Sequence, residues 1–125
     1  MSEKNARTCG SGPKLIFACS GAADVGAIAD QAARKLTKDG VGKMFCSVGL
    51  GGRVPGILAT TESAARILAI DGCPSNCVKN SLEQAGFDTF EHLQLTDLGL
   101  EKGKTPPTPG IVERVAAAGA AKLVC

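Results

Sequence analysis

Four of the six cysteines in this sequence lie in patterns that could support thiol chemistry. They are Cys19, Cys46, Cys73 and Cys77, and the last two form a Cys-x-x-x-Cys pair. A thiolate is a strong ligand for zinc and other thiophilic metals, and it is also the nucleophile of thiol enzymes. Because the four cysteines come from three separate segments, either chemistry requires a fold that brings those segments together.

Three short apolar runs predict buried β-strands beside these cysteines. They are residues 14–18, 43–48 and 66–70, and runs of this length are typical of parallel strands that are covered on both faces. The first run ends just before Cys19, the second contains Cys46, and the third ends just before the sequence Asp71-Gly72-Cys73. Alternating apolar residues over 90–95 predict a fourth strand.

Helical patterns separate the predicted strands. Apolar residues at helical spacing after Asp24 predict a helix that ends before Gly40. Pro74 suits the first turn of another helix, which Gly86 would stop. The same patterns assign three further segments: a flexible glycine-rich run at 49–52, two short helical pieces within 53–66, and a last helix at 111–121.

Strands that alternate with helices predict an α/β fold. We expect one three-layer domain over residues 14–125, after a flexible N-terminal tail at 1–13. Its sheet should have four or five mainly parallel strands in a Rossmann-like or flavodoxin-like arrangement, with helices on both faces. Because the carboxyl ends of parallel strands share one edge, the four cysteines are expected to meet there.

A shared site of this kind favours a thiophilic metal. We expect zinc, with iron, copper or an iron–sulfur cluster as alternatives. The competing hypothesis is a thiol enzyme or sulfur carrier, in which Cys19 and Cys73 carry a persulfide or exchange disulfides. Both cysteines precede predicted helices, whose N-termini lower the pKa of a thiol. Strand alternation could instead turn Cys46 into the core.

Several other polar residues have simpler explanations. Asp24 and Asp71 are expected to be a helix cap and a turn residue, Arg53 a solvated cation and His92 a surface or strand residue. Two cysteines outside the strand ends are expected to be incidental, Cys9 and Cys125.

Composition argues against other classes of partner. Of the 125 residues, 44% are hydrophobic but only 3% are aromatic, and the net charge is +2. A nucleic-acid-binding protein usually has a stronger basic face or stacking aromatic residues. No apolar run reaches the ~18 residues of a membrane span, and the first 13 residues lack a signal-peptide core. We therefore expect a cytoplasmic protein with reduced cysteines.

The motifs around the cysteines resemble a known family. The sequences Cys19-Ser20-Gly21, Asp24-Val25-Gly26 and Asp71-Gly72-Cys73-Pro74, with the later Cys77, are similar to those of the DGC-domain family, to which zinc binding is ascribed. The resemblance covers about residues 14–118. It implies a small prokaryotic cytoplasmic protein with a cysteine-bound zinc and no established activity. By position Cys19, Cys73 and Cys77 match the motif cysteines, and Cys46 matches less distinctively.

Overall fold

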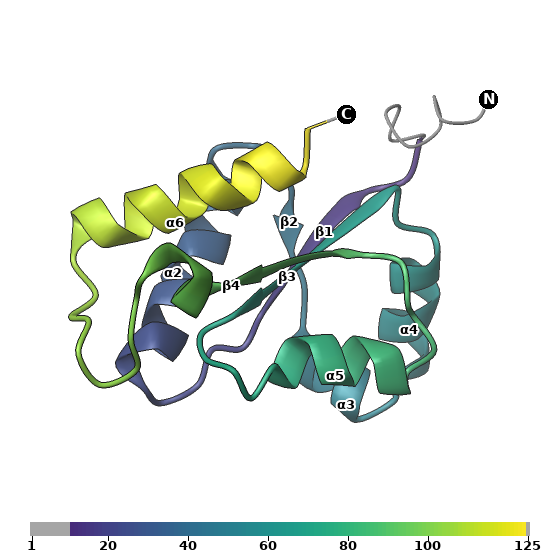
Figure 1. Cartoon of the computed structure of the whole chain (residues 1–125). Coiled ribbons are helices and arrows are strands. Elements are labelled where there is room, and N and C mark those ends of the chain that lie inside the picture. Colours follow the sequence, from purple (N-terminus) through teal and green to yellow (C-terminus); the bar gives the residue numbers. More distant parts are fainter. Residues whose placement is uncertain (1–10, 125) are drawn as a thin grey trace.

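The fold is a parallel sheet between two layers of helices. A computed structural model describes residues 11–124, so the predictions for residues 1–10, Cys9 among them, and for Cys125 lie outside the described residues. Within them the sheet has four strands, all parallel, in the order β2-β1-β3-β4 (Figure 1). The strands are β1 (Lys14–Ala18), β2 (Lys43–Met44), β3 (Arg66–Asp71) and β4 (Glu91–Gln94).

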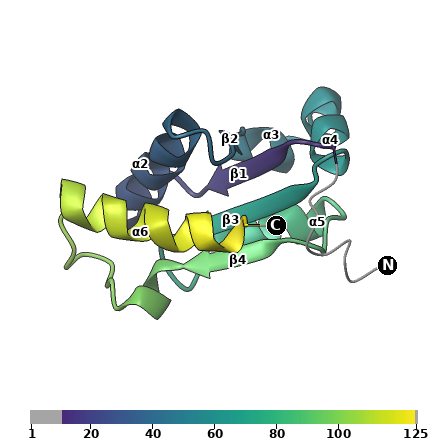
Figure 2. The same cartoon turned by 90° about the horizontal axis from the view of Figure 1, so that it is seen from above.

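The helices are divided between the two faces of the sheet (Figures 1 and 2). One face carries α2 (Asp24–Lys38) and α6 (Pro109–Lys122), and the short 3-10 helix η1 (Leu95–Leu98) follows β4. The other face carries α3 (Ser47–Gly51), α4 (Pro55–Glu62) and α5 (Cys77–Gln84). None of the helices in residues 11–124 has the length and apolar character that crossing a membrane requires.

Alternation along the strands divides the core into two apolar layers. Ile16 and Ala18 of β1 pack with the buried residues of α2 and α6, whereas Leu15 and Phe17 pack with those of α3 and α5. Successive side chains of a strand point to opposite faces, so a continuous apolar run contributes to both layers. This arrangement confirms the predicted three-layer α/β domain.

The strand order also fixes where a ligand site is expected. The order 2-1-3-4 corresponds to the first four strands of the flavodoxin-like order. β1 leads into α2 on one face, and β3 leads through a turn into α5 on the other face. A crevice opens between two neighbouring strands whose connections leave in opposite directions, and ligands of open α/β sheets bind in such crevices. Here that position lies between the carboxyl ends of β1 and β3.

Two glycines end helices as the sequence predicts. Gly40 follows α2 with φ 77°, and Gly86 follows α5 with φ 96°. In each case the next residue donates from its backbone N–H to a carbonyl five residues back, Val41 to Leu36 and Phe87 to Leu82. Glycine adopts this left-handed conformation without the steric cost that other residues incur.

The segment after β2 differs from the prediction. The strand expected over 43–48 ends at Met44, and residues 49–51 of the run expected to be flexible belong to helix α3. The Ser47 hydroxyl donates to the Ala18 carbonyl (2.7 Å) and takes the place of a strand partner. Gly49 allows α3 to pack on α4, because a Cβ there would lie 2.7 Å from the Ile57 side chain.

Three smaller expectations are also corrected. Residues 53–66 contain one helix rather than two pieces, with Pro55 in its first turn. Arg53 is not simply solvated, since its guanidinium donates to the carbonyls of Leu50 and Gln84. Pro74 lies in a turn before α5, which begins only at Cys77. At the start of the described chain, the Pro13 carbonyl accepts from the Ala65 N–H (2.8 Å).

Candidate thiol site

Three of the predicted cysteines line one hollow at the crevice between β1 and β3. We call this the thiol hollow; its volume is about 450 Å³, and Cys19, Cys73 and Cys77 lie on its wall. Cys19 directly follows β1, and its N–H donates to the Ile70 carbonyl of β3 (3.1 Å), which fixes it to the end of the sheet. Cys19 and Cys73 are partly buried and Cys77 is exposed. The hollow therefore offers three thiols from two neighbouring strand ends.

Two glycines allow the segments around these cysteines to approach closely. A Cβ at Gly72 would lie 2.9 Å from the backbone of Val25, the second residue of α2. A Cβ at Gly26 would lie 2.6 Å from the backbone oxygen of Gly21. Both distances are too short for real Cβ atoms, so any larger residue would push α2 away from the cysteine-bearing turns.

Asp71 organises the turn that carries Cys73 and Cys77. Its side chain is 1% exposed, and its carboxylate accepts from the backbone N–H groups of Val78 (2.8 Å) and Lys79 (3.1 Å). These groups belong to the first turn of α5, whose N–H groups have no partner within the helix. Nε2 of His92 on β4 lies 2.9 Å from the same carboxylate. Asp71 thus connects β3, α5 and β4.

Hydrogen bonds from Ser75, more than the local charges, favour a thiolate at Cys73. Hydrogen bonding from the backbone N–H of Ser75, and then from its hydroxyl, lowers the pKa of the Cys73 thiol below its usual value. The positive charge of Lys102 lowers this pKa further, against opposing contributions from burial and from Asp71. A deprotonated thiol is the form that binds metals and attacks electrophiles.

Lys102 reaches the thiol hollow because its loop is tied to α2. The Asp24 carboxylate accepts from the backbone N–H groups of Gly103 (2.8 Å) and Thr105 (3.0 Å), as well as from Val25 at its own helix. These hydrogen bonds lower the pKa of Asp24, and the bond from Gly103 contributes most. The residue predicted as a helix cap therefore holds a loop nearly 80 positions further along the chain.

Backbone strain lies next to two of the cysteines. Ser20 (φ 49°) follows Cys19, and Asn76 (φ 53°) precedes Cys77. Residues other than glycine adopt this left-handed region rarely, and such residues concentrate at functional sites.

Cys46 lies apart from the thiol hollow. It is exposed just before α3, and it lines a second hollow between α2 and the segment after β2, which we call the edge hollow. Cys19 lines both hollows. Within residues 11–124 no group of three or more His, Cys, Asp or Glu side chains is already arranged to hold a metal ion. The three thiols line the same hollow but do not form a preorganised metal-coordination site.

The family comparison matches most of the chain. The model of the DGC domain matches residues 15–118, a range that includes all four predicted cysteines and the Asp71-Gly72-Cys73 sequence. This chain belongs to the DGC-domain family. The resemblance inferred from the motifs is thereby confirmed.

A curated DGC-domain relative is the anaerobic and virulence modulator AnvM of Pseudomonas aeruginosa. It is 39% identical to this chain over 88 residues, which cover 70% of this chain and 67% of the relative. No solved structure is similar enough to this DGC-domain chain to be matched with it.

Three residues of this DGC-domain site were missed by the sequence analysis or given a minor role. His92 and Lys102 reach the site from parts of the chain that carry no local motif. Asp24 was assigned to its own helix, although it also holds the loop of Lys102. The one available signal was the position of His92 on a strand predicted to lie in the same sheet as Asp71.

Proposed function

We propose that this protein binds a thiophilic metal ion, zinc, through the thiolates of Cys19, Cys73 and Cys77. The observation that carries the proposal is that these three thiols, from two separate segments, line one hollow at the switch point of the sheet. A zinc site with three protein ligands keeps a fourth position for water or another exchangeable ligand. Cys46 is left out of this ligand set because it does not line the thiol hollow.

The donor set fits zinc chemically. Thiolates select zinc, copper(I) and iron–sulfur clusters over hard cations such as magnesium. Ser75 and Lys102 favour the deprotonated form of Cys73, which is the form that coordinates. Because the thiols are not yet arranged as a cage, binding should require the side chains on the turns after β1 and β3 to rotate toward one another. A bound zinc ion would supply positive charge and a Lewis-acid centre at that point.

A metal assay with matched cysteine variants tests this proposal. The full chain, purified anaerobically under reducing conditions, should contain one zinc ion per chain by elemental analysis. Serine at position 19, 73 or 77 should each strongly reduce zinc retention, because a protonated hydroxyl is a poor ligand. The matched control is Cys46→Ser, which should retain zinc. Equal retention in all four variants would refute the assignment, and iron or copper in place of zinc would correct the metal.

A second candidate is thiol chemistry at Cys73, as a sulfur carrier or in disulfide exchange with Cys19. The lowered pKa of Cys73 favours it, together with the lysine that faces this thiol. In the metal-free protein, alkylation should then be fastest at Cys73. Lys102→Gln should slow it, whereas Lys104→Gln, which removes an exposed lysine that pairs with Glu101, should not. If three thiols are instead protected from alkylation together, and a chelator makes them reactive, the metal site is favoured.

A regulatory role in the cytoplasm is consistent with either chemistry. The name of the Pseudomonas relative describes that protein as an anaerobic and virulence modulator. Thiols that hold a metal under reducing conditions release it when they are oxidised, which would make such a site sensitive to oxygen. We therefore propose that this protein acts as a metal-dependent regulator in a reducing compartment.

A further inference from the structure

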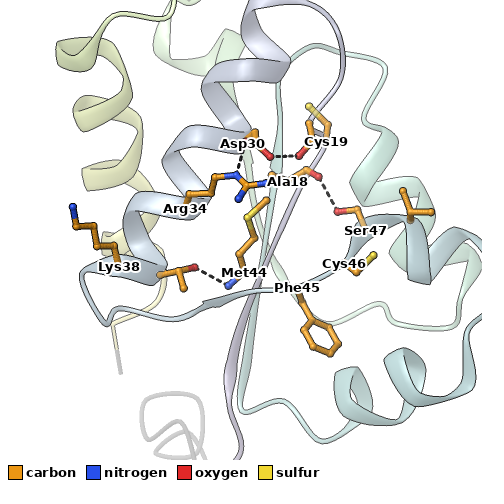
Figure 3. Close-up of a pocket in the computed structure, with 12 residues that line it drawn as sticks. Ala18, Cys19, Asp30, Arg34, Lys38, Met44, Phe45, Cys46 and Ser47 are labelled. Carbon is orange, nitrogen blue, oxygen red and sulfur yellow. Dashed lines mark hydrogen bonds and ion pairs between the residues drawn. The ribbon is translucent and has the colours of Figure 1, made fainter.

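The edge hollow exists because β2 is short. β2 pairs with β1 only as far as Ile16 and Met44, and the last backbone hydrogen bond runs from the Phe45 N–H to the Ile16 carbonyl (2.8 Å). β1 continues to Ala18, so the sheet is open beside its final residues. The result is a hollow of about 820 Å³ between α2 and the start of α3 (Figure 3). This volume lies within the ~300–1,000 Å³ of small-molecule sites.

The backbone of Ala18 faces this opening. Neighbouring residues of a strand direct their N–H groups to opposite sides, and the Cys19 N–H is directed to β3. The Ala18 N–H and carbonyl are therefore directed to the β2 side, where β2 has no residue opposite them. The Ser47 hydroxyl satisfies the carbonyl. Among residues 11–124 the N–H of this residue, which is 1% exposed, has no hydrogen-bond acceptor and remains a donor on the side of the hollow.

The charges around the edge hollow favour an anion. Arg34 and Lys38 of α2 line it, and Asp30 is the acidic residue on its wall. The Asp30 carboxylate already accepts from Arg34 Nε and from the Ser20 hydroxyl, both at 2.8 Å. Burial raises the pKa of Asp30, but these hydrogen bonds outweigh burial and hold it below its usual value. The terminal nitrogens of the guanidinium have no acceptor among residues 11–124, so they can receive a second carboxylate.

The opposite wall carries an exposed thiol. In Figure 3, Arg34 extends from α2 toward the end of β1, and Ser47 and Cys46 lie on the far side of the hollow. Cys46 is exposed there, with the apolar side chain of Met44 between the cation and the thiol. A ligand that matches the cation of Arg34, the apolar side chain of Met44 and the thiol of Cys46 in this order has a carboxylate at one end, a short apolar body and a sulfur at the other end.

We propose that the edge hollow binds low-molecular-weight disulfides that carry carboxylates, and that Cys46 forms a mixed disulfide with them. The Cys46 thiolate attacks one sulfur of the small disulfide, a new sulfur–sulfur bond forms, and the original one breaks. The other half leaves as a thiolate, which takes up a proton from water. Cys46 is thereby oxidised and one half of the small disulfide is reduced. This proposal does not rest on metal binding, because Cys46 lies outside the proposed zinc ligands.

Three small disulfides of similar size test the charge preference. The reduced full chain is treated with 3,3′-dithiodipropionate (anionic), 2-hydroxyethyl disulfide (neutral) or cystamine (cationic), and the rate at each cysteine is measured by peptide mass spectrometry. Rates are normalised to those of the chain unfolded in urea. Cys46 should react about fivefold faster with the anionic than with the neutral reagent, as expected for one or two exposed charge contacts.

Two arginine variants with the same net charge distinguish an effect of the edge hollow from an effect of the overall charge of the protein. Arg34→Gln should abolish the preference at Cys46 and leave the rates at Cys73 unchanged. Arg34 is largely exposed, so this variant should fold normally. Arg114→Gln on α6 removes an exposed arginine that does not line the hollow, and it should keep the preference. Equal normalised rates for the three reagents at Cys46, or a preference that survives in Arg34→Gln, would overturn the proposal.

Discussion

Nε2 of His92 lies 2.9 Å from the buried carboxylate of Asp71, across two neighbouring strands. The same carboxylate accepts two backbone N–H groups from the first turn of α5. It therefore sets the position of the turn between Gly72 and Cys77 relative to the sheet.

Asp71→Asn should destabilise the protein and loosen the cysteine-bearing turn. In the wild type these backbone N–H donors face a carboxylate, whereas the asparagine amide can turn its NH2 group toward one of them. A buried donor left without an acceptor lowers the free energy of unfolding by about 2 kcal/mol. Urea unfolding should show this loss, and thiol titration should show faster reaction of Cys73 and Cys77. The matched control is Asp97→Asn, an exposed aspartate in η1, which should change stability little. Wild-type stability and thiol reactivity in Asp71→Asn would contradict the role assigned to this carboxylate.

Asp24 should hold the loop of Lys102 in a pH-dependent way. Hydrogen bonds from Gly103, Thr105 and Val25 lower the pKa of Asp24 below its usual value of 3.8. A carboxylate whose pKa is lowered by folding stabilises the folded state above the usual value, and this contribution is lost as the pH falls through the lowered pKa. The loop should therefore remain in place at neutral pH and detach only in strong acid.

Nuclear magnetic resonance of the two loop amides measures this dependence. The Gly103 and Thr105 amide signals should titrate together with a midpoint below 3.8. In Asp24→Asn this titration should be absent, and both amides should exchange faster at neutral pH. A midpoint at or above 3.8, or unchanged amide exchange in the variant, would show that Asp24 does not hold the loop.

Gly72→Ala should disturb both stability and metal retention. The new Cβ would lie 2.9 Å from the backbone of Val25, so the first turn of α2 must move. Overpacking of this kind costs about 2 kcal/mol. Thermal unfolding and elemental analysis should both report the change. Gly56→Ala is the control, because a Cβ at that helical position meets no atom within 4 Å. This variant should keep its metal, and its free energy of unfolding should equal that of the wild type or exceed it by up to about 1 kcal/mol.

Metal removal should leave the fold in place. The two apolar layers around the sheet are built from apolar residues of five helices and four strands in the described chain, and the thiols lie only at their margin. Small zinc modules unfold without metal because they lack such a core. Far-ultraviolet circular dichroism under reducing conditions should therefore be unchanged by a chelator.

Amide exchange should localise the effect of the metal. Without it, the segments 19–24 and 72–77 should exchange faster, since they carry the proposed ligands. The strands should exchange as before. Loss of most secondary structure after chelation would mean that the metal is required for folding.

Local patterns were enough to predict the elements that position the site. The apolar runs of β1 and β3 and the helical spacing in α2 depend on neighbours in sequence, and glycines 40 and 86 end helices as predicted. The repeated order of strand, cysteine and helix placed Cys19 and Cys73 at one edge of the sheet, because parallel strands align their carboxyl ends. The family and the three-layer architecture followed from the same residues.

Contacts between distant residues decided the rest. The length of β2 depends on a hydroxyl 29 positions away from Ala18 and on the packing of Gly49 against α4, so the apolar run at 43–48 could not reveal it. Asp24 and Gly103 are 79 positions apart, and only the folded chain brings Lys102 to the thiols. The same geometry placed Cys46 on the edge hollow, which shares only Cys19 with the thiol hollow. Sequence periodicity reports which face of an element is buried, whereas the partner of each polar side chain is set by packing between elements.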